Sequence, residues 1–196
     1  MVFVDNLALE LLILFFSGML IIYTTINIYR EKKDNKKSET KINIIPLFIL
    51  GLFIFINGIA EEIMWPLPGS YNILFYDPFV LFGMILLGFS ISIALKQKLS
   101  YIGFFAFLSG IITGVYGIFG YLLNMTQSPQ MLLALYVLFG ISGIFAYPST
   151  LIYDSNKKSK MHLFILILFW VFLFLASLTA LVLGTVALNG HLKTTP

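Results

Sequence analysis

Apolar residues fill the chain in six long runs, and short polar segments separate the runs. A helix needs about 20 apolar residues to cross about 30 Å of hydrocarbon, and each run is close to that length. The pattern therefore predicts an all-α fold: a polytopic membrane helix bundle with six transmembrane helices, forming a single transmembrane domain over residues 1–196. The predicted spans are about 7–29, 42–60, 75–95, 102–123, 131–153 and 161–188.

Composition agrees with this prediction and excludes other classes of protein. Of the 196 residues, 59% are hydrophobic and only 11% are charged, whereas a soluble domain carries about 25% charged residues. An ordinary water-soluble enzyme and a disordered tail are both excluded. The chain has no cysteine, which removes disulfides, iron–sulfur clusters and thiolate metal sites. We predict no cofactor and no metal site.

The basic residues predict which way the helices run. All 12 Lys and Arg residues except Lys193 fall in the segments 30–41, 96–101 and 154–160. These segments are alternate connections, so they lie on one side of the membrane, and short basic loops stay in the cytoplasm. We therefore expect a multi-pass protein of the cell membrane with these loops in the cytoplasm and both termini outside. The basic loops would lie against an anionic inner leaflet, and no nucleic-acid partner is expected.

Carboxylates near the opposite ends of the spans are the main candidates for chemistry: Glu10, Glu61, Glu62 and Asp77. Because a helix rises about 1.5 Å per residue, they lie about one hydrocarbon thickness from the basic loops. We interpret them first as markers of the outer interface. The alternative is an acidic site that binds a cation, carries protons or meets a partner. Asn57 lies one turn before Glu61 on the same helix face, and we expect it to make an interhelical hydrogen bond or to line such a site.

The segment after the second span combines prolines, a glycine and aromatic residues. Two prolines deny backbone donors and the glycine permits a turn, so the second helix must end here. Trp65, Tyr71 and Tyr76 suit the headgroup belt, and we expect the loop to close at Asp77-Pro78. A rigid interfacial connector is the first interpretation, and a lid or a partner-docking surface is the alternative. The residues that define this interfacial loop are Trp65, Pro66, Pro68, Gly69 and Tyr71.

The same stretch resembles a known family. The run Trp65-Pro66-Leu67-Pro68-Gly69 with Tyr71-Asn72, followed by an apolar span that contains Phe82-Gly83, is similar to the integral membrane family filed as domain of unknown function 981. The resemblance covers the first three spans by residue and the others by hydropathy. It implies a multi-span membrane protein, with an archaeal source as the expectation, and it transfers no functional residue.

Small residues predict close helix packing, because they let helices approach each other in lipid. We expect these faces to pack inside the bundle, with contact to a second subunit as the alternative. They comprise Gly103, Gly110, Gly114 and Gly117 on the fourth span and Ala176, Ala180 and Gly184 on the sixth.

One N-glycosylation sequon occurs, at Asn124-Met125-Thr126. The predicted topology places it outside, where glycosylation occurs. Asn124 is therefore a candidate glycosylation site.

Motifs for catalysis are missing from the sequence: it has no phosphate-binding glycine loop, nucleophile elbow or paired-histidine zinc motif. We assign no catalytic residue and favour a protein that is not an enzyme. The sparse polar residues, the small-residue faces and the aromatic loop favour a non-catalytic accessory or structural subunit of a larger membrane complex, such as a respiratory one. Its partners would be the lipid bilayer and other membrane subunits. The alternatives are a small transporter or channel that uses the outer carboxylates, and a lipid- or quinone-binding membrane enzyme.

Overall fold

Helices make up the described part of the chain, which contains no strand. The computed structural model describes residues 6–34, 41–155 and 159–193. Within these residues, six helices are each long and apolar enough to cross a membrane. The predicted all-α membrane fold is therefore confirmed. The helices are α1 (Asn6–Asp34), α2 (Lys41–Met64), α3 (Tyr71–Ala94), α4 (Ser100–Leu122), α5 (Pro129–Asp154) and α6 (Lys160–Lys193).

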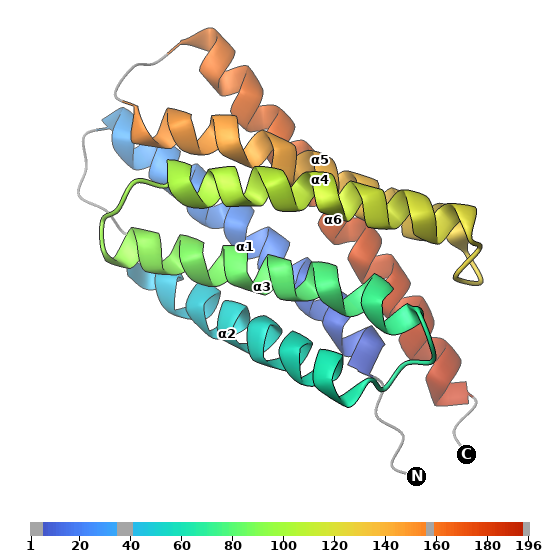
Figure 1. Cartoon of the computed structure of the whole chain (residues 1–196). Coiled ribbons are helices and arrows are strands. Elements are labelled where there is room, and N and C mark those ends of the chain that lie inside the picture. Colours follow the sequence, from blue (N-terminus) through green and yellow to red (C-terminus); the bar gives the residue numbers. More distant parts are fainter. Residues whose placement is uncertain (1–5, 35–40, 156–158, 194–196) are drawn as a thin grey trace.

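The six helices form a ring of contacts. α2 packs on α3, α4 packs on α5, and α1 packs on α6 (Figure 1). α1 also contacts α2, and α6 contacts α5, so the α1–α6 pair joins the other two pairs. α3 and α4 close the ring through a much thinner seam than the one between α4 and α5. The contact between α1 and α2 is thinner still, so the ring is weakly closed at two places, between α3 and α4 and between α1 and α2.

The two ends of the bundle differ in charge. The start of α1, the end of α6 and the α2–α3 connection lie together at one end (Figure 1), which we name the carboxylate end. The α3–α4 connection, with Lys96 and Lys98, lies at the other, which we name the lysine end. Of the basic loops, residues 35–40 and 156–158 lie outside the described residues. The side of the membrane that each end faces stays a prediction.

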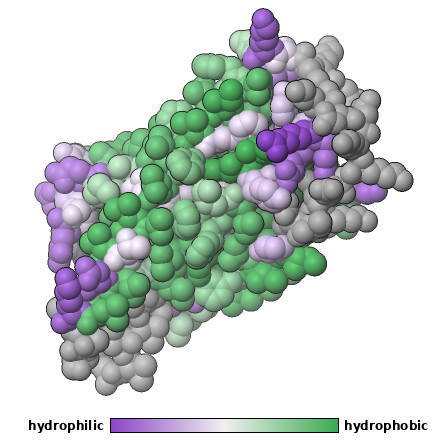
Figure 2. All heavy atoms as spheres, turned by 180° about the vertical axis from the view of Figure 1, so that it is seen from behind, coloured by the Kyte–Doolittle hydropathy of each residue, from purple (hydrophilic) through white to green (hydrophobic). Residues whose placement is uncertain are grey.

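The outer surface is apolar around the middle of the bundle. Figure 2 shows hydrophobic residues covering the middle of one face, with hydrophilic residues gathered toward its two ends. On α2, Ile45, Ile56 and Ile63 are each more than half exposed. Such a large continuous apolar surface is unfavourable in water and suits hydrocarbon. The chain is thus a multi-pass helical membrane protein.

Helix boundaries near the carboxylate end differ from the predicted spans. α2 continues past residue 60 to Met64, and α3 already begins at Tyr71. The expectation that the loop closes at Asp77-Pro78 is therefore wrong, because Pro78 lies inside α3. A proline inside a helix removes the hydrogen bond to the carbonyl four residues earlier. Here that carbonyl belongs to Leu74, and the Tyr136 hydroxyl of α5 donates to it at 2.6 Å.

Both small-residue faces pack inside the bundle, as expected, except at Gly114, where an added Cβ atom would meet nothing within 4 Å. A Cβ atom added at Gly110 on α4 would lie 2.6 Å from the carbonyl oxygen of Gly140 on α5. Ala176 and Ala180 of α6 are fully buried, and a Cβ at Gly184 would lie 3.1 Å from the Leu11 side chain of α1. These residues set the close approach of α4 to α5 and of α1 to α6.

Candidate functional site

Two buried carboxyl groups meet at the carboxylate end of the bundle. Glu10 of α1 and Glu61 of α2 are each only 3% exposed, and each lies within electrostatic range of the other. Asn57 Nδ2 donates a hydrogen bond to Glu10 Oε1 at 3.1 Å. The interhelical hydrogen bond expected for Asn57 is thus present. A carboxylate that only marked the water interface would be exposed to water. The burial of Glu10 and Glu61 against neighbouring helices therefore favours a further role for them.

A second pair of carboxyl groups links three helices. The carboxyl groups of Glu62 on α2 and Asp77 on α3 lie close to each other. The Tyr116 hydroxyl of α4 donates a hydrogen bond to Asp77 Oδ2. Two ionised carboxylates close together repel each other, so a proton or a cation would stabilise the pair. This pair therefore offers a place to hold a proton or a cation between α2 and α3, and Tyr116 links it to α4.

Tyr76 lies near carboxyl groups of both pairs. Its side chain is completely buried, which corrects its expected position in the headgroup belt. The hydroxyl lies within electrostatic range of Glu10, Glu61 and Glu62, yet it has no hydrogen-bond partner in the described part of the chain. We name the whole group the carboxylate cluster; it comprises Glu10, Asn57, Glu61, Glu62, Tyr76, Asp77 and Tyr116.

The interfacial loop is attached to this cluster through Asn72. Asn72 is fully buried; its Oδ1 accepts a hydrogen bond from the Leu67 backbone N–H at 3.3 Å. Its Nδ2 donates to the backbone carbonyl of Glu61, also at 3.3 Å. Gly69 has a φ of 56°, the left-handed conformation that glycine adopts readily. The five residues that define this loop are all exposed: Trp65, Pro66, Pro68, Gly69 and Tyr71.

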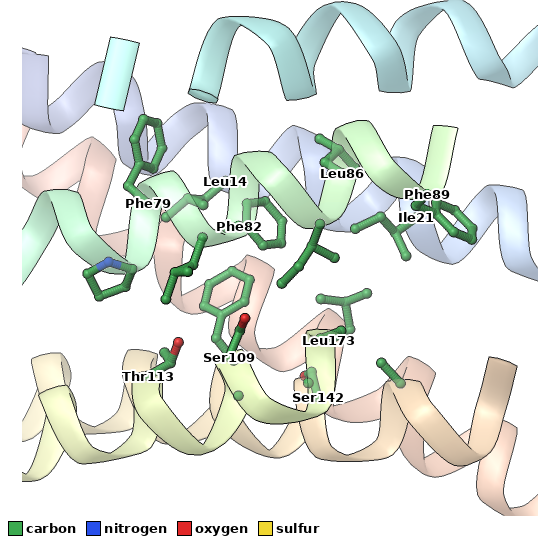
Figure 3. Close-up of a pocket in the computed structure, with 18 of the residues that line it drawn as sticks. Leu14, Ile21, Phe79, Phe82, Leu86, Phe89, Ser109, Thr113, Ser142 and Leu173 are labelled. Atoms are coloured by element: carbon green, nitrogen blue, oxygen red, sulfur yellow. The ribbon is translucent and has the colours of Figure 1, made fainter. Parts of the chain in front are cut away.

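A cavity of about 140 Å³ lies inside the ring of helices. On the side of α1 and α3 it is lined by apolar side chains that include Leu14, Phe79, Phe82 and Phe89 (Figure 3). On the side of α4 and α5 it meets the small hydroxyl residues Ser109, Thr113 and Ser142. The lining is therefore apolar, with a few hydroxyl groups along one wall.

The cavity reaches both the carboxylate cluster and the thin seam. Glu10 is part of its lining, and Thr25 and Tyr153 line the part nearer the lysine end. Leu81 of α3 and Thr113 of α4 also line it and are half-exposed. The cavity therefore reaches partly exposed residues on both sides of the α3–α4 seam.

The family model described as "Protein of unknown function (DUF981)" matches residues 1–194. The chain belongs to this family. The match extends the resemblance of the first three spans across the whole bundle, including the α4–α5 pair that forms the cavity wall. Comparison of this DUF981 chain with curated proteins and with solved structures found no match.

Other candidate residues of the DUF981 chain do not join this site. Within residues 6–34, 41–155 and 159–193, no three His, Asp or Glu side chains come together in a way that could hold a metal ion. Asn124 is exposed in the α4–α5 connection with a φ of 50°, whereas the Thr126 hydroxyl of the same sequon is buried. The sequon thus stands apart from the carboxylate cluster.

The sequence did not indicate that Asn72 and the buried tyrosines belong to this site. Asn72 and Tyr76 are four residues apart and therefore share one face of α3. That pattern becomes visible only when α3 begins at Tyr71. Tyr116 and Tyr136 come from other helices, and no local pattern links them to Asp77 or Leu74.

Proposed function

We propose that this DUF981 protein binds an amphiphilic ligand from the bilayer, with the hydrocarbon part in the cavity and the headgroup at the carboxylate cluster. One observation carries the proposal: Glu10 lines the same cavity as Phe79, Phe82 and Phe89. Apolar and aromatic walls with a few placed polar groups are typical of small-molecule sites. A buried carboxylate needs a polar or charged partner, and an amphiphile supplies both parts at once.

The size of the cavity limits how much of the ligand it holds. A cavity of about 150 Å³ with apolar walls is known to take up benzene, and this cavity is about 140 Å³. It therefore takes one ring or a short length of chain. The rest of the ligand would leave through the α3–α4 seam into the bilayer.

This proposal develops one of the alternatives from the sequence, a lipid- or quinone-binding protein. The accessory-subunit hypothesis drew on small-residue faces that were free for a partner, and both faces are used inside the ring. A transporter or channel for ions would need a polar path toward the lysine end, and the cavity lining is mostly apolar. If the basic loops face the cytoplasm as proposed, the headgroup site belongs to the outer leaflet.

The proposal is tested by filling the cavity. Ser109 is buried in the α4 wall, so Ser109→Phe places a ring where the ligand would bind. The matched control is Ile112→Phe on the exposed side of the same helix. We would measure saturable labelling of the purified full chain by a photoactivatable 12-carbon alcohol and map the labelled peptides.

Labelling of α3, α4 and α5 peptides that Ser109→Phe abolishes and Ile112→Phe preserves would support the proposal. Equal labelling of Ser109→Phe and the unchanged chain, with both proteins folded, would overturn it. A stable large complex on a native gel, without saturable labelling, would instead favour the accessory-subunit hypothesis.

A further inference from the structure

We infer that the carboxylate cluster recognises a monovalent cationic group with N–H donors, so that the amphiphile bound by this protein carries a primary amine next to Glu10 and Tyr76. The inference rests on the proposed function and specifies the headgroup of the same ligand.

The first observation is the Tyr76 hydroxyl. It is completely buried, lies within electrostatic range of Glu10, Glu61 and Glu62, and has no hydrogen-bond partner in the described residues. A buried hydroxyl without a partner costs free energy, and such groups in native proteins are usually satisfied. An N–H donor from a ligand would satisfy the hydroxyl oxygen.

The second observation is the sign of the charge around this hydroxyl. The described polar contacts of Glu10 are with Asn57 and with the neighbouring Glu61, and those of Glu62 are with Asp77. All the charged groups among these contacts are acidic, and in the sequence the only Lys or Arg predicted for this end is Lys193. Carboxylates removed from water are stabilised by a cation or a proton, so the cluster is complementary to a positive headgroup.

The third observation concerns which cation fits. The described residues place no three His, Asp or Glu side chains around one point for a metal ion. An ammonium group has three N–H donors and no acceptor, which matches a carboxylate and a hydroxyl oxygen. A quaternary ammonium group lacks these donors and would leave Tyr76 unsatisfied. The geometry thus favours a primary amine.

The test compares two probes of equal chain length, dodecylamine and dodecanol, on the full chain in phosphatidylcholine nanodiscs. We expect the unchanged chain to bind the amine about tenfold or more tightly than the alcohol, as one charge-assisted hydrogen bond would produce. Glu10→Gln and Tyr76→Phe should each reduce amine binding toward the level of the alcohol and leave alcohol binding unchanged. Glu31→Gln, the same change near the other end of α1, should keep the amine preference.

The outcomes separate this inference from the proposed function. Equal binding of amine and alcohol to the unchanged chain would overturn the headgroup assignment and leave the cavity function standing. Failure of both probes to bind would overturn the proposed function as well. Stabilisation by sodium chloride alone, lost in Glu10→Gln, with no amine preference, would assign the site to a free monovalent cation instead of a headgroup.

Discussion

The hydroxyl of Tyr136 on α5 donates to the backbone carbonyl of Leu74 on α3 at 2.6 Å. Pro78, four residues after Leu74, has no N–H, so this carbonyl lacks its usual partner within the helix. In a membrane, a carbonyl without a partner costs several kcal/mol. The tyrosine therefore makes a proline inside α3 tolerable and at the same time joins α3 to α5 across the ring.

This relationship predicts that the effects of changing the two residues depend on each other. Tyr136→Phe should lower the free energy of unfolding by about 1–3 kcal/mol, because it leaves the Leu74 carbonyl unsatisfied. In a Pro78→Ala background the same change should cost clearly less, because the restored N–H can bond to that carbonyl. Unfolding in mixed micelles of the four proteins measures the coupling. Equal costs in the two backgrounds would contradict this explanation.

A second long-range contact caps α4. Leu99 and Ser100 donate their backbone N–H groups to the Asp154 carboxylate of α5 at 2.9 and 2.8 Å. Leu99 stands at the N-cap without a capping side chain of its own. Asp154→Ala should therefore destabilise the protein by about 1–2 kcal/mol, as loss of an N-cap does, and Asp154→Asn by less because it keeps one acceptor oxygen. Thermal unfolding in detergent measures both.

The matched control for this cap is Ser70→Ala at the start of α3. Ser70 occupies the N-cap position but makes no side-chain hydrogen bond there, so its loss should change stability by less than about 0.5 kcal/mol. If Ser70→Ala lowers the stability as much as Asp154→Ala does, the hydrogen bonds to Asp154 do not stabilise α4 in the way described.

Hydropathy alone predicts the helices of this protein, because a segment in lipid has to satisfy its backbone hydrogen bonds internally. Their ends near the carboxylate end are less predictable. Glu61 and Glu62 continue α2 because charged residues do not break a helix, and Pro78 stays within α3 only because Tyr136 lies opposite. Both effects depend on neighbours that local patterns do not reveal.

The candidate site is only partly visible in the sequence. The carboxylates and Asn57 stand out as polar residues in apolar surroundings. The contact between Glu10 and Asn57 joins residues 47 positions apart, so it depends on which faces α1 and α2 turn toward each other. The cavity is formed by five helices together, and no single segment carries a signal for it.

The same substitution, glycine to alanine, should have opposite effects on stability at two positions of α4. Gly110→Ala should destabilise the bundle by about 1–3 kcal/mol, because the new Cβ would lie 2.6 Å from the Gly140 carbonyl oxygen. At Gly114, one turn later, a Cβ meets nothing within 4 Å. Gly114→Ala should therefore be neutral or stabilising by up to about 1 kcal/mol, because alanine favours helix. Unfolding measurements that give both variants the same sign would contradict the packing of α4 on α5.

The proposed orientation can be tested directly because the chain has no cysteine. Lys98 is exposed at the lysine end and Gln127 is exposed in the α4–α5 connection at the opposite end. With basic loops in the cytoplasm, a membrane-impermeant maleimide should label Gln127→Cys in intact cells and Lys98→Cys only after the cells are opened. The reverse pattern would place the carboxylate cluster in the cytoplasmic leaflet and would move the proposed headgroup site there. Labelling of both variants in intact cells would show that the cells leak, and a cytosolic protein with an exposed cysteine controls for this.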